Sequence, residues 1–279
     1  MEGLLRAVLP LLAAALGLAG TGAHAAPRTL KVAAAASLRP ALEEIGAGFR
    51  AGKPGVDVAA TYGASGTLFA QIRAGAPFDL FLSAEAAMPR RLVEAGRGVS
   101  PAFAYAFGRL ALWVPNDSRL ELGRLGLAAL ADPSVRKVAI GNPAVSPYGV
   151  AAEAAMRSAG VHEAVQPKLV LGQSVQQAAQ FAQSGNAQAA LLPLSLALAP
   201  PLSKEGRFVA VPAGSHRPVE QAGVVLASSR EPELARAFAA WLLGPEGRAV
   251  LARHGYALPA TPEPPAPATP EPPAPAAPR

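Results

Sequence analysis

Apolar residues along this chain follow two alternating patterns. Short runs that are apolar almost throughout, such as Phe78-Asp79-Leu80-Phe81-Leu82, are typical of strands buried on both faces of a sheet. Between these runs, apolar residues recur every three or four positions, as at Leu42, Ile45 and Phe49, which predicts helices with one buried face. For the first part of the chain we expect strands over residues 30–35, 56–62 and 78–82, and helices over 38–49, 66–74 and 86–95.

The same alternation continues through the rest of the chain. We expect strands over 110–114, 138–142, 168–171, 189–194, 208–211 and 222–227, and helices over 148–159, 175–183, 231–243 and 245–254. Strands that alternate with helices predict an α/β protein built from mostly parallel sheets with helices on their faces. After about Leu258 the sequence Ala-Thr-Pro-Glu-Pro-Pro-Ala-Pro occurs twice in tandem, which predicts a proline-rich tail outside the core.

Serine stands at four predicted junctions between a strand and a helix: Ser37, Ser65, Ser146 and Ser174. Each serine alone is explained as an ordinary helix N-cap. Pro40 complicates this at the first junction, because a proline near the helix start has no N–H for the Ser37 hydroxyl to bind. The carboxyl ends of parallel strands border the ligand crevice of α/β proteins, so the four junctions can converge across a cleft between two lobes.

The segments around these serines carry no Asp, Glu, Lys or His. A site made of hydroxyls, amides and helix dipoles offers hydrogen-bond donors without a counter-charge, and this suits an anion. Each hydrogen bond to a charged group contributes about 1.5–3 kcal/mol, so four or five bonds give ~6–15 kcal/mol before association costs. The pattern predicts a site for a fully deprotonated tetrahedral dianion, because monohydrogen phosphate needs an acceptor for its proton.

The N-terminal sequence indicates an export signal, and the composition excludes several classes of function. Residues 1–25 resemble a signal peptide, with Arg6, an apolar core over 8–18 and a small-x-small site at Ala23-His24-Ala25. The chain has no cysteine, which excludes disulfides, thiolate metal sites and a lipobox anchor. The net charge is +6, but the Lys and Arg residues are scattered and not interleaved with aromatics, so we expect no nucleic-acid partner.

Several motifs resemble the periplasmic molybdate-binding proteins of ABC importers. The most specific is the block from Gln71 to Ala84, QIRAGAPFDLFLSA. The segments Ala-Ala-Ala-Ser-Leu ending at Leu38, Gly-Ala-Ser-Gly-Thr-Leu at 63–68, Ser-Pro-Tyr-Gly at 146–149 and Gly-Gln-Ser-Val at 172–175 are also similar. The resemblance extends from Leu30 to about Tyr256.

The resemblance implies a type II periplasmic-binding fold with the ligand between two lobes. Lobe 1 would comprise residues 26–107 plus 217–257, lobe 2 residues 108–216, and the tail residues 258–279. Ser37 and Ser65 would bind the oxyanion through hydroxyl and amide groups, and Tyr148 and Val175 through backbone amides. These residues would contact molybdate oxygens and not the metal itself. Some family members add a tyrosine hydroxyl from the strand near Leu192, whereas here the segment is Leu192-Pro193-Leu194-Ser195.

By the same resemblance, the protein would be a monomer that captures molybdate, and also tungstate, for the transmembrane permease subunits of an importer. It would act in the periplasm without a cofactor and without enzymatic activity.

Other functions remain open from the residues alone. The same fold binds sulfate, thiosulfate or small organic anions, and such a protein can sense a ligand instead of delivering it. A secreted serine hydrolase using Ser65 would need glycine at position 67 of its Gly-x-Ser-x-Gly motif, where Thr67 stands. An iron site would have to use Tyr62, Tyr105 and Tyr148, which lack carboxylate or histidine neighbours at ligand spacing.

Overall fold

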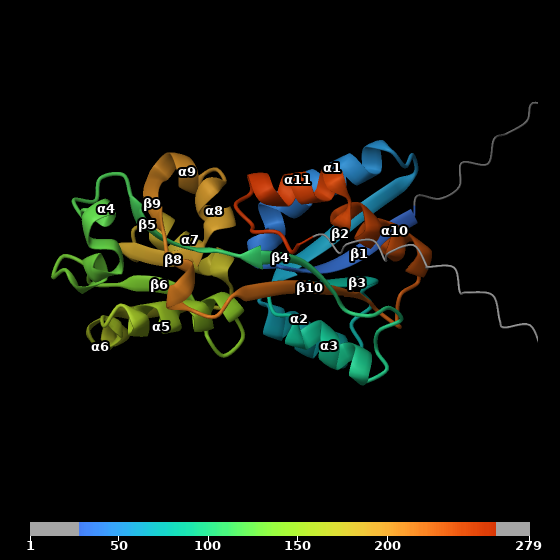
Figure 1. The fold of residues 1–279 in the computed structure, drawn as a ribbon, viewed down its shortest axis with the longest axis horizontal. Coiled ribbons are helices and arrows are strands. Elements are labelled where there is room, and N and C mark those ends of the chain that lie inside the picture. Colours follow the sequence, from blue (N-terminus) through green and yellow to red (C-terminus); the bar gives the residue numbers. More distant parts are fainter. Residues whose placement is uncertain (1–27, 261–279) are drawn as a thin grey trace, which may run out of the picture.

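A computed structural model describes residues 28–260, and this part of the chain forms two five-stranded sheets, each covered by helices (Figure 1). We call each sheet with its helices a lobe. The expected signal peptide and most of the proline-rich tail lie outside the described residues. Within them, no helix is both long enough and apolar enough to cross a membrane.

The first sheet has the strand order β2-β1-β3-β10-β4. Its strands are β1 (Arg28–Ala35), β2 (Val56–Gly63), β3 (Leu80–Ser83), β4 (Phe103–Gly108) and β10 (Val219–Val225). Helices α1 (Arg39–Ala51), α10 (Pro232–Leu243) and α11 (Pro245–Arg253) cover one face, and α2 (Ser65–Arg73) and α3 (Ala87–Glu94) cover the other (Figure 1). Leu30, Val32, Leu80 and Leu82 are completely buried, as apolar strands covered on both faces require.

The second sheet has the order β7-β6-β8-β5-β9. Its strands are β5 (Leu110–Pro115), β6 (Val138–Gly141), β7 (Leu169–Gly172), β8 (Ala189–Pro193) and β9 (Gly206–Ala210). The helices of this lobe are α4 (Leu122–Leu125), α5 (Pro147–Ser158), α6 (His162–Val165), α7 (Val175–Gln183), α8 (Leu194–Leu198) and α9 (Leu202–Glu205). Short 3-10 turns lie at η1 (Ala36–Leu38), η2 (Gly126–Ala131), η3 (Gln166–Lys168) and η4 (Ala213–Ser215).

The predicted fold class is confirmed: in each sheet four strands run in one direction and one strand runs against them. In the first sheet β1 pairs in parallel with β2 and β3, while β10 runs antiparallel to β3 and β4. The second sheet repeats this division, because β5 runs antiparallel to β8 and β9. In each lobe the reversed strand is the first one after the chain crosses from the other lobe: β4 leads into β5, and β9 returns to β10 (Figure 1). Strand β4 and the short helices α4, α6, α8 and α9 were not expected.

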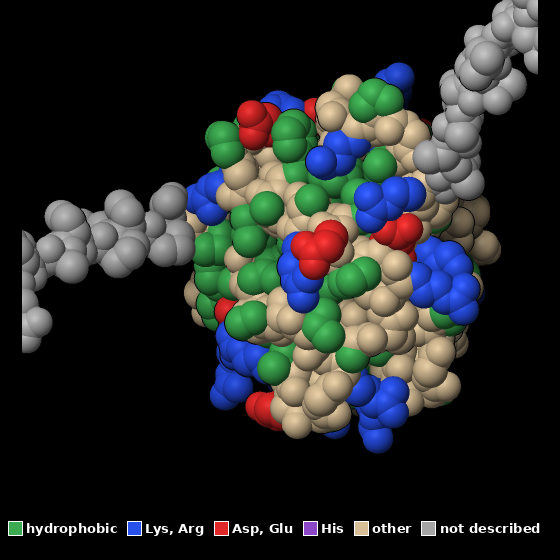
Figure 2. Space-filling model, turned by 90° about the vertical axis from the view of Figure 1, so that its right-hand side faces the viewer, with side chains coloured by type: hydrophobic (Ala, Val, Ile, Leu, Met, Phe, Trp, Pro, Cys, Tyr) green, Lys and Arg blue, Asp and Glu red, His purple; other side chains and the backbone are tan. Residues whose placement is uncertain are grey.

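Charged side chains lie dispersed on the surface. Figure 2 shows the end of the molecule formed by the first lobe, where Lys and Arg side chains are separated by acidic, apolar and other groups. Elsewhere and on this end alike, basic side chains form exposed ion pairs, and the described residues include the pairs of Arg28 with Glu231 and of Arg253 with Glu44. Such pairs contribute little to stability, because water screens them.

Candidate anion-binding site

Ser37, Ser65, Tyr148 and Val175 lie around one small cavity between the lobes. The cavity contains about 190 Å³ of space free of protein atoms. Its lining consists of Ala35, Ala36, Ser37, Gly63, Ala64, Ser65, Ala84, Ser146, Pro147, Tyr148 and Val175. The fold therefore brings together all four residues that the sequence selected, two from each lobe.

The first lobe places two buried serine hydroxyls at the cavity. Ser65 Oγ accepts a hydrogen bond from the backbone N–H of Ala84 at 2.9 Å, so its own proton is free to be donated elsewhere. Ser37 is 1% exposed, and its Oγ has no hydrogen-bond partner among the described residues. A buried polar atom without a partner costs about 1–3 kcal/mol, which marks Ser37 Oγ as a group that a ligand would satisfy.

The second lobe places two helix N-termini at the cavity. Tyr148 is the second residue of α5, and Val175 is the first residue of α7. The N–H groups at these positions have no intrahelical partner, and each helix carries about half a positive charge at this end. Both residues therefore offer backbone donors that favour an anion.

The helix starts differ from the expected pattern at two of the four serines. Ser174 is the N-cap of α7 and accepts from Gln177 N–H at 3.3 Å, as predicted, and Ser146 is the N-cap of α5. Ser65, however, is the first residue inside α2, and Ser37 lies within the 3-10 turn η1 that separates β1 from α1. Because neither of these two hydroxyls caps its helix, both remain available at the cavity.

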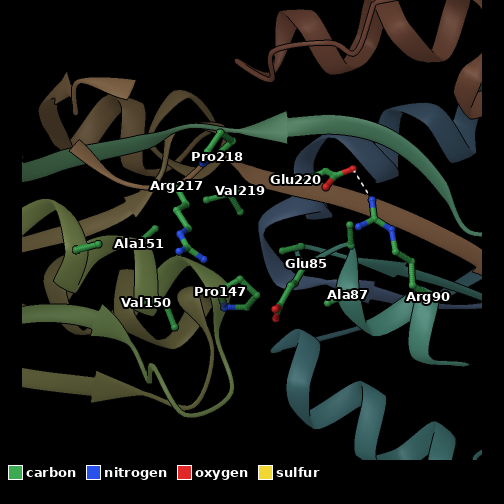
Figure 3. A pocket seen from close by; sticks show the side chains of 13 residues that line it. Glu85, Ala87, Arg90, Pro147, Val150, Ala151, Arg217, Pro218, Val219 and Glu220 are labelled. Carbon is green, nitrogen blue, oxygen red and sulfur yellow. Dashed lines mark hydrogen bonds and ion pairs between the residues drawn. The ribbon is translucent and has the colours of Figure 1, made fainter. Parts of the chain in front are cut away.

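The cavity lining contains no charged side chain, whereas a larger cavity beside it contains four. This second cavity is larger and shares Ala84 and Pro147 with the first. Figure 3 shows Glu85 and Arg90 on one side of it, Arg217 on the other, and an ion pair of 3.0 Å between Arg90 and Glu220. The charged groups are thus balanced and lie outside the small cavity.

The lobes touch directly at the edge of the small cavity. The N–H of Gly66 in α2 donates to the carbonyl of Val145 in the second lobe at 3.0 Å. A Cβ atom on residue 66 would lie 3.0 Å from both the Cα and the carbonyl oxygen of Val145. A methyl group here would require the Val145 backbone to move by a few tenths of an ångström, so glycine favours this close approach of the lobes.

Three buried tyrosines surround the cavity or lie behind it: Tyr105, Tyr148 and Tyr256. Burial raises the pKa of Tyr105 and of Tyr148 well above the ordinary value, and it raises the pKa of Tyr256 to about 12. These phenols are neutral at physiological pH and can donate hydrogen bonds. Tyr62, the third tyrosine of the iron hypothesis, lies apart from them, with the Arg39 guanidinium 4.1 Å from its ring centre.

Residues 28–260 contain no group of three or more His, Asp or Glu side chains placed to hold a metal ion. The segment from Leu192 to Ser195, where the family resemblance suggested a tyrosine in some members, is buried and contains none. Instead, Ser195 Oγ donates to the carbonyl of Ser37 at 2.8 Å. Sequence reasoning did not select Gln221 or Tyr256, although a glutamine directly before the apolar run Ala222–Val225 of β10 is a usable signal.

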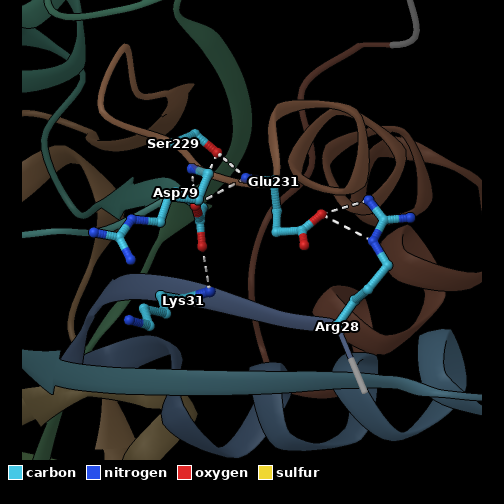
Figure 4. Close-up of polar contacts among 6 residues, drawn as sticks. Arg28, Lys31, Asp79, Ser229 and Glu231 are labelled. Carbon is cyan, nitrogen blue, oxygen red and sulfur yellow. Dashed lines mark hydrogen bonds and ion pairs between the residues drawn. The ribbon is translucent and has the colours of Figure 1, made fainter. Parts of the chain in front are cut away.

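Asp79 stabilises the start of α10, away from the cavity. Its Oδ1 accepts from Ser229 Oγ at 2.8 Å and from Arg230 N–H at 2.9 Å, at the beginning of α10 (Figure 4). Its Oδ2 accepts from Lys31 N–H at 2.7 Å. The carboxylate thus joins β1, β3 and α10 within the first lobe.

Comparison with known proteins identifies the family. The family described as bacterial extracellular solute-binding protein matches residues 30–257. The chain belongs to this family. It is also 36% identical over 253 residues to the molybdate-binding protein ModA of Rhodobacter capsulatus, covering 90% of this chain and 96% of the relative. The ModA protein of Azotobacter vinelandii is 32% identical over 248 residues, covering 87% of this chain and 94% of the relative.

Solved structures agree with this assignment. The periplasmic molybdate-binding protein of Azotobacter vinelandii superposes with a TM-score of 0.76 at 31% identity, over 83% of this chain and all of that one. The sulfate-binding protein SubI of Mycobacterium tuberculosis has a TM-score of 0.68 at 19% identity, over 82% of this chain and 86% of that one. The second likeness concerns the fold alone. This solute-binding protein is accordingly a binding protein and not an enzyme, and no cofactor is indicated.

Proposed function

We propose that this solute-binding protein captures molybdate as the cargo of an ABC importer. The observation that carries the proposal is the convergence of Ser37, Ser65, Tyr148 and Val175 on one small cavity without charged side chains. The relatives and the solved structure named above as molybdate-binding proteins support the same ligand.

Each of the four residues has a distinct part in the proposed complex. The hydroxyls of Ser37 and Ser65 donate to oxyanion oxygens from the first lobe. The N–H groups of Tyr148 and Val175 donate from the second lobe, aided by the dipoles of α5 and α7. The contacts are to molybdate oxygens, so none of these residues ligates molybdenum directly.

The lining also supports selection among anions. No carboxylate stands at the cavity to accept a proton, which disfavours monohydrogen phosphate. Sulfate has the same charge and shape as molybdate, so we propose that cavity size separates them. Tungstate matches molybdate in charge and shape and is close to it in size, and we propose it as a second ligand.

Transport requires that the lobes move and that a permease recognises the result. We propose that residues 26–107 plus 217–257 move as one body and residues 108–216 as the other, with closure around the ion creating the surface that the transmembrane subunits recognise. We further propose that residues 1–25 direct the protein to the periplasm and that it works there as a monomer.

The test is calorimetric titration of the mature protein with molybdate and tungstate, with sulfate and phosphate at equal concentration as controls. We expect tight one-to-one binding of molybdate and tungstate, and binding of neither control. Binding of sulfate with similar affinity would redirect the proposal to a general sulfur-oxyanion receptor. Heat from none of the four anions would overturn it.

A further inference from the structure

Two buried hydrogen bonds connect the lobes directly at residues of the anion site. Ser195 Oγ, on α8 of the second lobe, donates to the carbonyl of Ser37 in the first lobe at 2.8 Å. Gln221 Nε2, on β10 of the first lobe, donates to the hydroxyl of Tyr148 on α5 of the second lobe at 2.9 Å. Ser195 is 3% exposed and Gln221 is completely buried, so water does not compete for either bond.

The carbonyl of Ser37 accepts a second hydrogen bond from its own lobe. The hydroxyl of Tyr256, which packs with the core of the first lobe, donates to it at 2.8 Å. The carbonyl therefore keeps a partner if the bond from Ser195 is lost. Loss of the Ser195 hydroxyl removes a link between lobes without leaving a buried carbonyl unsatisfied.

The carboxamide of Gln221 also bonds to both lobes, but it does so through two different atoms. Its Oε1 accepts from the hydroxyl of Tyr105, on β4 of the first lobe, at 3.0 Å, while its Nε2 reaches across to Tyr148. The chain passes from the first lobe to the second at Gly108. Only glycine at this position leaves room for the contact between Gln221 and Tyr148. A Cβ atom there would lie 2.0 Å from the Tyr148 hydroxyl oxygen.

We infer that Ser195 and Gln221 are positioning residues that couple closure of the lobes to the geometry of the oxyanion site. Ser195 ties the second lobe to Ser37, and Gln221 ties the first lobe to Tyr148, so each bond holds one ligand-contact residue against the opposite lobe. The bonds break when the lobes separate, and they therefore stabilise the closed form selectively. This inference rests on the proposed function for its ligand, molybdate.

The size of the effect follows from the worth of a hydrogen bond between neutral groups. Removing one such bond shifts the equilibrium between closed and open forms by about two- to tenfold. Because apparent affinity scales with the fraction of protein in the binding-competent form, the dissociation constant for molybdate rises by about the same factor when the open form dominates without ligand.

The chain provides two matched pairs of variants. S195A and Y148F each remove a hydroxyl that bonds across the lobes. Y256F and Y105F remove hydroxyls that donate to the Ser37 carbonyl and to Gln221 Oε1 from within the first lobe. By calorimetry we expect S195A and Y148F to weaken molybdate binding about two- to tenfold. S195A should change the melting temperature of the ligand-free protein little, whereas Y148F should also lower it, because the buried Gln221 Nε2 loses its acceptor. Y256F and Y105F should lower that melting temperature and leave the dissociation constant within about twofold.

A second measurement reports closure without relying on affinity. The natural chain has no cysteine, so E94C and E163C allow spin labels to be placed on α3 and α6, one on each lobe. Distances between the labels, measured with and without molybdate, should show a smaller closed population in S195A than in Y256F.

The outcomes separate this inference from the proposed function. If the wild-type protein fails to bind molybdate, the proposed function fails, and the label distances in the four variants then decide about the links between lobes. Equal weakening by S195A and Y256F would overturn the inference, because satisfaction of the carbonyl would then matter and not the link. Wild-type affinity and wild-type distances in both S195A and Y148F would also overturn it.

Discussion

The beginning of α10 and the small cavity between the lobes both gather donors near helix N-termini, but only the first has an anion of its own. At α10, the carboxylate of Asp79 accepts hydrogen bonds from Ser229 Oγ and from the N–H of Arg230. At the cavity, the helix ends of α2, α5 and α7 meet hydroxyls and small apolar side chains, with no carboxylate in the lining. The same physical preference for negative charge therefore serves stability in one place and ligand capture in the other.

This difference predicts how substitutions in the two regions should affect stability and ligand affinity. Where the chain supplies the carboxylate, substitution should cost stability and leave ligand binding intact. Where the chain supplies only donors, substitution should cost affinity and leave the fold intact. Four experiments test this division.

The double variant S37A/S65A should have the largest effect. It removes two charge-assisted hydrogen bonds of the proposed complex, about 3–6 kcal/mol, so molybdate affinity should fall by about 10²–10⁴-fold. Titration calorimetry measures the loss, and circular dichroism checks that the fold persists. S174A is the matched control, because Ser174 caps α7 but does not line the cavity. Unchanged affinity in the double variant would remove both serines from the site.

Alkaline pH should destabilise the protein through the tyrosines around the cavity. Their pKa values are raised by burial, that of Tyr256 to about 12, while tyrosine in the unfolded chain ionises near pH 10. The unfolded state therefore loses protons first, and stability that is complete below pH 10 falls as the pH rises toward 12. Each tyrosine contributes a slope of about 1.4 kcal/mol per pH unit.

Urea unfolding at several pH values between 8 and 11 measures this slope. Y105F should reduce it by the share of one tyrosine. A free energy of unfolding that stays flat to pH 11, or a slope identical in Y105F, would contradict the assignment.

The variant D79N should destabilise the protein and spare binding. It replaces the carboxylate at α10 with a neutral group and places an N–H donor opposite Lys31 N–H or Arg230 N–H, whichever way the amide turns. We expect a loss of about 1–3 kcal/mol, a drop in melting temperature of several degrees, and unchanged molybdate affinity. D57N is the control, because Asp57 forms an exposed pair with Arg50 at 3.3 Å and should have almost no effect. A large loss of affinity in D79N would break the division between the two regions.

The variant G66A should have the smallest effect of the four. Its methyl group would press on the backbone of Val145 and hold the lobes slightly apart. We expect molybdate affinity to fall about tenfold with little change in melting temperature. G123A is the control, because a Cβ atom at that helical position meets no atom within 4 Å. Equal affinities in G66A and G123A would show that the contact with Val145 does not limit closure.

Much of the fold follows from local pattern. Helix α7 spans the predicted residues, and the strands over the apolar runs lie within one to three residues of their expected ends. Strand β4 was missed because the segment from Phe103 to Gly108 is a strand only by pairing with β10, which is distant in sequence. The one reversed strand in each sheet was not identified from the sequence, since strand direction depends on how the chain crosses between lobes.

The sequence predicted which residues form the candidate site. It did not predict the backbone geometry that positions them. Ser37, Ser65, Tyr148 and Val175 follow apolar strands, and the absence of nearby charge is visible in the sequence. The positions of the serines within their first turns depend on the backbone at each junction, such as the 3-10 turn before α1. Single-residue patterns do not encode that geometry.

The sequence by itself determined the alternation of strands and helices, the uncharged serine junctions and the family, because these depend on residue type and short-range spacing. Only the tertiary structure decided that Gln221 joins Tyr105 to Tyr148, and that Ser195 and Tyr256 share the carbonyl of Ser37. These contacts join residues 73 to 219 positions apart. Their hydrogen bonds exist because the chain crosses twice between lobes and buries polar groups that must then find partners.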